Sequence, residues 1–116
     1  MSDLSNPMAM FDVAGKVALV TGASGAFGMV AARVLAGAGC KLVLAAGSAD
    51  ALSEIAAECR GIGAEVVEVN ARPASEAVCA DLVAKAVAAF GALDILVVAS
   101  GMNKVAKIDE MAPETF

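Results

Sequence analysis

The chain has 116 residues, of which 59% are hydrophobic and 18% are charged, and its formal net charge is −5. Its eight Lys and Arg residues are spread singly, so the sequence lacks the basic stripe by which proteins bind nucleic acid. No apolar run approaches the ~20 residues of a membrane-spanning helix, so we expect neither nucleic acid nor a membrane as a partner.

The first ten residues differ from the rest of the chain. Residues 1–10 are polar and methionine-rich and contain a proline, which predicts a mobile arm. They place no basic residue ahead of an apolar core, so they do not form a signal peptide, and we expect a cytoplasmic protein. Residues 11–116 are then expected to form one domain, because a chain of this length leaves no room for a second.

A strand, a glycine-rich turn and a helix follow one another near the start of this domain. The apolar residues 16–21 predict a strand buried on both faces, and residues 22–28 form the turn. The helix is expected over residues 27–38. Its predicted apolar face consists of Phe27, Val30, Ala31, Val34, Leu35 and Ala38.

The same alternation continues along the chain. Residues 41–45 predict a second strand, and the next helix starts at Ser48 or Asp50, whose side chains accept hydrogen bonds from free N–H groups. A third strand is expected over residues 64–69. Pro73 suits the first turn of the third helix, where its missing N–H costs nothing.

A fourth buried strand, residues 95–99, follows Asp94, and Ser100 with Gly101 turns the chain out of it. The order β-α-β-α-β-α-β with short connections predicts an α/β fold, a Rossmann-like doubly wound parallel sheet of which only the first half is present. The expected strand order is 3-2-1-4. The glycine-rich turn and the end of the fourth strand should then meet at one crevice.

The glycine-rich turn indicates a phosphate-bearing ligand. Residues without bulk let backbone N–H groups approach a pyrophosphate, and the following helix directs the positive end of its dipole at the same charge. Glycine-rich turns also occur wherever a strand reverses into a helix, so the flanking strand and helix carry this interpretation.

With these residues placed, the chain resembles the N-terminal half of a short-chain dehydrogenase/reductase. The resemblance rests on residues 11–22, on residues 89–97 before the fourth strand, and on residues 111–116, which resemble the start of the next helix. It implies an NAD(P)-dependent oxidoreductase that transfers hydride between the nicotinamide and an alcohol or ketone. This chain would supply the cofactor-binding part, as a truncated Rossmann-type domain.

The resemblance is imperfect at two places in the cofactor site. The family motif T-G-x-x-x-G-x-G has its middle glycine at Ala26, while Gly25 lies one place early. The family turn N-N-A-G falls on residues 98–101, where only Gly101 is kept. Both asparagine side chains are therefore absent, and we expect backbone contacts to the cofactor at this turn.

The choice between NAD and NADP is read at the end of the second strand. An acid there accepts from the ribose 2′-OH of NAD, whereas a basic residue pairs with the 2′-phosphate of NADP. Ala46, Gly47 and Ser48 hold neither type, so both cofactors stay open and the prediction inclines toward NADP. After the third strand, Asn70 is favoured over Val69 for contact with the adenine, because its amide both donates and accepts.

The predicted cofactor site collects residues from four connections. It consists of Gly22, Ser24, Gly25, Ala26, Phe27, Gly28, Ala46, Gly47, Ser48, Asn70, Ala71, Ala99, Ser100 and Gly101. The family uses a tyrosine as general acid/base, and this sequence contains no tyrosine and no histidine, so we predict no catalytic residue. The alternative is a truncated, non-catalytic nucleotide-binding or assembly module.

We do not expect metal binding, but we do expect the chain to associate with another protein chain. Cys40, Cys59 and Cys79 form no C-x-x-C pair, and without histidine they predict buried free thiols and no metal site. The fourth strand would be a hydrophobic edge, which predicts a homo-oligomer or pairing through that edge. The small-molecule substrate is not specified by these residues.

Overall fold

The computed structural model describes residues 6–100. A short 3-10 helix, Pro7–Phe11, precedes the alternating strands and helices. These are β1 (Val17–Thr21), α1 (Ala26–Gly37), β2 (Lys41–Ala45), α2 (Ala49–Ile62), β3 (Val66–Val69), α3 (Glu76–Phe90) and β4 (Ile95–Val98). The predicted alternation is confirmed, with element ends shifted by up to three residues.

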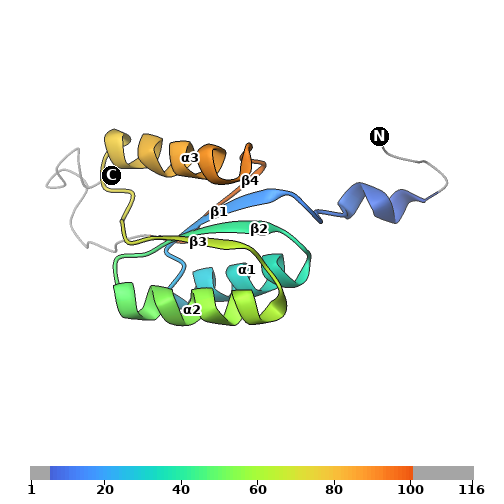
Figure 1. Cartoon of the computed structure of the whole chain (residues 1–116), viewed down its shortest axis with the longest axis horizontal. Coiled ribbons are helices and arrows are strands. Elements are labelled where there is room, and N and C mark those ends of the chain that lie inside the picture. The colour runs from blue at the N-terminus through green and yellow to red at the C-terminus, as the bar shows by residue number, and fades with distance from the viewer. Residues whose placement is uncertain (1–5, 101–116) are drawn as a thin grey trace, which may run out of the picture.

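The strands form one parallel sheet in the order β3-β2-β1-β4, as predicted. Figure 1 shows α1 and α2 on one face of this sheet and α3 on the other. Val20 of β1 is in register with Leu44 of β2 on one side and with Val97 of β4 on the other. Consecutive parallel strands need crossover connections, and the three helices provide them.

The sheet is the centre of two hydrophobic cores, one on each face. All five residues of β1 are buried, as the continuous apolar run predicts for a strand covered on both sides. Leu52 and Ile55 of α2 belong to the core beneath α1 and α2, and Leu82 of α3 to the other. Each such side chain contributes about 1.5–3 kcal/mol when fully buried.

The predicted apolar face of α1 is correct for Ala31 and Leu35, which pack against the core, and wrong for its other members. Phe27, Val30 and Val34 are 81%, 55% and 63% exposed. The residues that α1 buries are small ones, Gly28, Ala32 and Ala36. A helix that packs closely on a parallel sheet needs small residues at the contact. The side chains of Phe27, Val30 and Val34 therefore lie outside the core, whereas Leu35 packs against it.

The start of α3 also differs from the prediction. Pro73 lies in the loop before the helix, and Ser75 is the residue that caps it, accepting from the backbone N of Val78 at 3.2 Å. A serine hydroxyl satisfies one free N–H of the first turn, so it sets the boundary more strongly than a proline nearby.

The structure also bears on the predictions made for the N-terminal arm, for residues near the end of the chain and for membrane-spanning helices. Residues 7–11, within the expected arm and its junction with the domain, form the 3-10 helix, and none of them is buried. Mobility of residues 1–10 stays a prediction. Gly101 and residues 111–116 lie outside the described residues. Within residues 6–100, no helix has the length and apolar character that crossing a membrane requires.

Candidate functional site

A crevice lies at the carboxyl ends of the strands, where the order of a doubly wound sheet reverses. Its volume is about 770 Å³, within the usual size range of small-molecule sites. Eight of the predicted cofactor residues line it. They are Gly22, Ser24, Gly25, Ala46, Gly47, Ala71, Ala99 and Ser100.

Two glycines allow the walls of this crevice to come together. Gly22 has φ +67°, and a Cβ there would lie 2.6 Å from the backbone N of Ser100. A Cβ at Gly28 would overlap the carbonyl oxygen of Gly22. The turn therefore packs directly against both the end of β4 and the first turn of α1, which only residues without side chains permit.

The N-terminus of α1 carries no side-chain cap. Gly25 is the N-cap residue, and no acidic residue follows it in the first turn. The first helical hydrogen bond runs from the backbone N of Met29 to the carbonyl of Gly25, at 2.9 Å. Helix geometry therefore leaves the N–H groups of residues 26–28 without intrahelical acceptors.

Ala26, where the family motif has its middle glycine, is the first residue of α1. None of the described non-glycine residues has a positive φ, so Ala26 holds its methyl group without backbone strain. The substitution keeps the local shape of the turn, and the N–H of Ala26 remains one of the free donors.

The end of β4 meets the end of β1, as predicted. Thr21 Oγ1 and Ser100 Oγ are hydrogen-bonded at 3.0 Å. The backbone N of Ala99 donates to the carbonyl of Thr21 at 3.1 Å. The glycine-rich turn and the segment after β4 therefore form one site, apart from Gly101, which lies outside the described residues.

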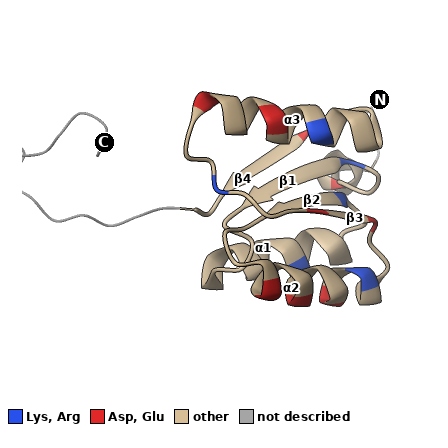
Figure 2. Cartoon of the chain, turned by 60° about the vertical axis from the view of Figure 1, so that its left-hand side comes forward, with Lys and Arg blue, Asp and Glu red and all other residues tan. Residues whose placement is uncertain are grey.

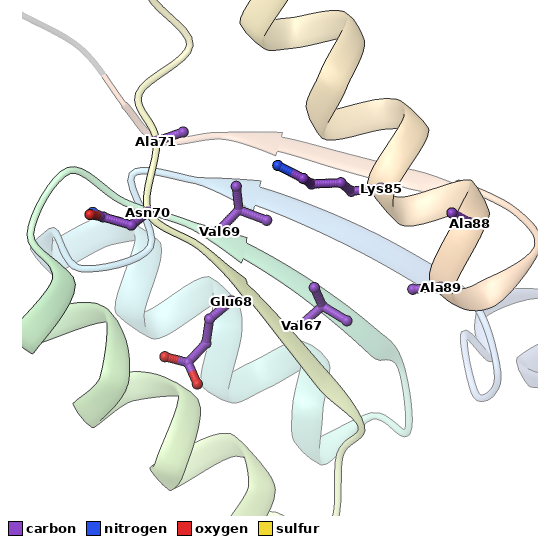
Figure 3. Close-up of a pocket in the computed structure, with 8 residues that line it drawn as sticks. All are labelled: Val67, Glu68, Val69, Asn70, Ala71, Lys85, Ala88 and Ala89. Atoms are coloured by element: carbon purple, nitrogen blue, oxygen red, sulfur yellow. The ribbon is translucent and has the colours of Figure 1, made fainter.

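Asn70 joins the ends of two strands. Its Nδ2 donates to the carbonyls of Ala46 and Gly47, at 2.9 and 3.1 Å. Asn70 itself lines a second hollow between β3 and α3 rather than the crevice. Figure 3 shows Val67 and Val69 on the α3 side of the strand, with Glu68 on the opposite side, toward α2.

Three other predicted residues do not line the crevice. Ser48 caps α2, where its Oγ accepts from the backbone N of Ala51 at 3.4 Å, and so resolves the choice between Ser48 and Asp50. The Phe27 side chain is 81% exposed, and Gly28 is buried in helix packing. These residues offer backbone or hydroxyl groups rather than side chains that fill the crevice.

Sequence reasoning missed Arg72. It is the one charged residue among the described residues that line the crevice. The available signal was its place three residues beyond the carboxyl end of β3, at the edge where the parallel strands all end. Hydrophobic residues of β4 and α3, among them Leu96 and Val83, line the crevice as well.

The cysteine prediction is correct for two residues and wrong for one. Cys40 and Cys59 are buried, and burial raises the pKa of both thiols. Cys79 is exposed and lines the crevice. Among residues 6–100, no three His, Cys, Asp or Glu side chains form a metal-binding group.

Most charged side chains lie away from the crevice. Figure 2 shows them mainly on the helices. Arg33 of α1 pairs with Glu58 of α2 at 2.6 Å, and its hydrogen bond lowers the pKa of that carboxyl. Both side chains are about half exposed, so the pair adds little stability.

Comparison with known proteins agrees with this geometry. A sequence model described as short chain dehydrogenase matches residues 16–116. An uncharacterized oxidoreductase of Mycobacterium tuberculosis is 44% identical over 110 residues, which cover 94% of this chain and 40% of that protein. The chain therefore spans less than half the length of this relative.

Two solved structures share the fold. L-sorbose reductase from Gluconobacter frateurii, complexed with NADPH and L-sorbose, has a TM-score of 0.77 and 34% identity, covering 87% of this chain and 39% of that one. A short chain dehydrogenase from Mycobacterium paratuberculosis bound to NAD has a TM-score of 0.77 and 25% identity, covering 90% of this chain and 43% of that one.

Proposed function

This chain belongs to the short-chain dehydrogenase family, and on that premise we propose that it is the dinucleotide-binding half of an NAD(P)-dependent oxidoreductase. The reaction is hydride transfer between the nicotinamide and an alcohol or ketone. The observation that carries the proposal is the uncapped N-terminus of α1, which follows a glycine turn packed against the end of β4.

The described residues fit such a cofactor. The three free N–H groups at the start of α1 form a donor set for a pyrophosphate, and the helix dipole favours its negative charge. Ser24, which also lines the crevice, adds a hydroxyl. Because Gly22 and Gly28 carry no side chains, the phosphates can approach the backbone closely.

The adenosine end is assigned to the ends of β2 and β3. Gly47 and Ala71 line the crevice with little side-chain bulk, which leaves room for a ribose and a flat base. Asn70 uses its Nδ2 to hold Ala46 and Gly47. Asn70 does not itself line the crevice, but it is bonded to two residues that do. Its Oδ1 remains an acceptor, and we assign it to the amino group of an adenine bound beside these residues.

The nicotinamide end is assigned to the segment after β4. Ala99 and Ser100 line the crevice there, and the Thr21–Ser100 hydrogen bond fixes this wall. When bound, the nicotinamide supplies or accepts the hydride. The chain contains no tyrosine and no histidine, so its own role is to bind and orient the cofactor.

A binding titration tests the proposal. The purified protein is titrated with NADPH, NADH and ADP by calorimetry, with guanosine diphosphate as a base control. We expect saturable binding of at least one nicotinamide dinucleotide, and weaker binding of ADP because it lacks the nicotinamide half. Absence of saturable binding of both dinucleotides at millimolar concentration would overturn the proposal.

Activity is measured separately from binding. The protein is mixed with the dinucleotide that binds and with a panel of secondary alcohols or ketones, and the absorbance of the reduced nicotinamide is followed. Turnover with one of these substrates supports the oxidoreductase. Binding without turnover across the panel would instead favour the nucleotide-binding module.

A further inference from the structure

We propose that Arg72 binds the 2′-phosphate of NADPH and makes this crevice select NADP(H) over NAD(H). The inference rests on the proposed function, because it names which dinucleotide the same site prefers. It depends on a contact between two loops that are adjacent in space and separated by 24 residues in the chain.

Arg72 lies across the end of β2. A Cβ on Gly47 would overlap Nε of Arg72 and would lie 2.7 Å from both Cζ and Nη2. The guanidinium therefore lies against the backbone of Gly47, in space that any other residue would fill with its own side chain. Gly47 is two positions beyond the last residue of β2, where the ribose of a dinucleotide is read.

The backbone that carries Arg72 is held in place. Asn70 donates to the carbonyls of Ala46 and Gly47, which ties the loop after β3 to the loop after β2. Pro73 follows Arg72 and restricts the backbone of both residues. The backbone N of Ala74 also donates to the carbonyl of Arg72, at 2.7 Å. The backbone from which the Arg72 side chain extends is therefore restrained.

The charge of Arg72 is available to a ligand. Arg33 and Arg60 are engaged by Glu58 and Glu68, whereas Arg72 forms no ion pair with any residue in the range 6–100. A guanidinium has several N–H donors in a planar fork, which matches a phosphate in a bidentate manner. Arg72 is also the one charged residue among the described residues lining the crevice.

The residue after β2, Ala46, is not the acid that would favour NAD. Ala46 is buried at 2% exposure and carries no carboxylate to accept from a ribose 2′-OH. The acid nearest in sequence is Asp50, in the first turn of α2. Among the described lining residues, none is acidic, so nothing there repels a 2′-phosphate.

Substitution of Arg72 tests the inference. Dissociation constants for NADPH and NADH are measured on the wild-type protein and on Arg72→Gln, with adenosine 2′,5′-bisphosphate and AMP as a pair that isolates the 2′-phosphate. We expect Arg72→Gln to weaken NADPH binding by about 10- to 100-fold, the effect of losing charged hydrogen bonds. NADH binding should stay within about twofold, because it lacks this phosphate.

Two further variants keep the test specific. Gly47→Ala retains the charge but displaces the guanidinium, so it should weaken NADPH more than NADH. Arg33→Gln makes the same charge change on α1, where Arg33 pairs with Glu58 away from the crevice, and should leave both affinities unchanged. Thermal melting of all variants confirms that they are folded.

The outcomes separate this inference from the proposed function. A wild-type protein that binds NADPH more tightly, and loses that preference in Arg72→Gln, supports it. Equal weakening of both dinucleotides, no change, or a wild-type preference for NADH overturns the inference and leaves the proposed function standing. Failure of the wild-type protein to bind either dinucleotide overturns both.

Discussion

The N-terminus of α1 differs from those of α2 and α3. Ser48 and Ser75 cap α2 and α3 with their side chains, and each helix has an acidic residue in its first turn, Asp50 or Glu76. The start of α1 has neither a side-chain cap nor an acid. All three helices cover the same sheet, so the fold alone does not explain the difference.

The loops that lead into all three helices line the crevice. The turn before α1 differs in consisting of small residues, Gly22, Ser24 and Gly25, and in packing against the backbone at the end of β4. A capping serine stabilises a helix by about 1 kcal/mol relative to alanine, and an acid in the first turn adds about 0.3–1 kcal/mol. At α1 a capping side chain would accept from the N–H groups that an anionic ligand needs. An acid in the first turn would offset the positive end of the helix dipole that attracts the ligand.

The largest expected effect comes from filling the contact between Gly28 and the turn. Gly28→Ala places a Cβ against the carbonyl of Gly22, a backbone atom that cannot move without shifting the turn. We expect a loss of about 1–3 kcal/mol in the free energy of unfolding. Binding of both dinucleotides should fall more than about tenfold, because the donors at α1 lose their alignment.

Gly37→Ala is the matched control in the same helix. A Cβ on Gly37 would meet no atom within 4 Å. Alanine in a helix is more stable than glycine by about 0.5–1 kcal/mol, so urea denaturation should show a small gain and titration no change. If Gly28→Ala behaves like Gly37→Ala in both measurements, the close packing at the turn has no role in binding.

The second effect comes from giving α1 the acid that the other helices have. Ala26→Asp places a carboxylate at the first position of α1, where it favours the helix dipole but repels a pyrophosphate. We expect dinucleotide binding to weaken about tenfold or more, with stability unchanged or raised. Calorimetric titration and urea denaturation measure the two effects separately.

Ala57→Asp makes the same change further along α2, more than two turns from its N-terminus. Ala26 and Ala57 are both exposed, so burial does not distinguish the two sites. We expect Ala57→Asp to leave the affinity within about twofold, as charges beyond a Debye length are screened. Equal weakening by both variants would show that net charge, not the position of α1, controls binding.

The sequence predicted the strand order and the convergence of the turn with Ser100, because continuous apolar runs and glycine stops fix element type and order. It identified the buried face of α1 only in part, through Ala31 and Leu35. That helix is apolar nearly all around, so periodicity could not separate the small residues that contact the sheet from Val30 and Val34. The face of α1 that is buried is set by close packing against the sheet, which needs small residues.

Arg72 was missed for a different physical reason. Its position in the chain places it near the crevice, but its contact with Gly47 depends on how a long side chain folds across a neighbouring strand. Spacing along one strand carries no information about that path. The site was therefore predictable where backbone and glycine geometry define it, and not where a flexible side chain completes it.

The third effect concerns the serine cap of α3, which we expect to contribute to stability and not to dinucleotide binding. Ser75→Ala removes the side-chain oxygen that accepts from Val78 at the start of α3. We expect the free energy of unfolding to fall by about 1 kcal/mol, with dinucleotide affinity unchanged. Ser75→Asp, which keeps a capping oxygen, should restore stability in urea denaturation. A change in dinucleotide affinity for Ser75→Ala without a loss of stability would contradict the proposal that the capped N-terminus of α3, unlike the uncapped one of α1, has no role in binding.

The smallest effect is expected at the other end of α2, where the side chain of Arg60 contacts two residues of β3. Arg60 donates to Glu68 at 2.8 Å and to the carbonyl of Val66 at 2.9 Å. The hydrogen bond from Arg60 lowers the pKa of Glu68 below its ordinary value. The pair is partly exposed, with Glu68 at 30% and Arg60 at 47%, so screening limits its contribution to a few tenths of a kcal/mol.

The pH dependence of stability has a definite sign at this pair. Because the folded pKa of Glu68 is depressed, its contribution is present above the unfolded value near 4.5 and is lost as the pH falls through the folded value. The difference in unfolding free energy between wild type and Glu68→Gln should therefore be largest above about pH 5 and shrink below about pH 4. A difference that stays constant across this range would show that the Arg60 contact does not stabilise the charged carboxylate.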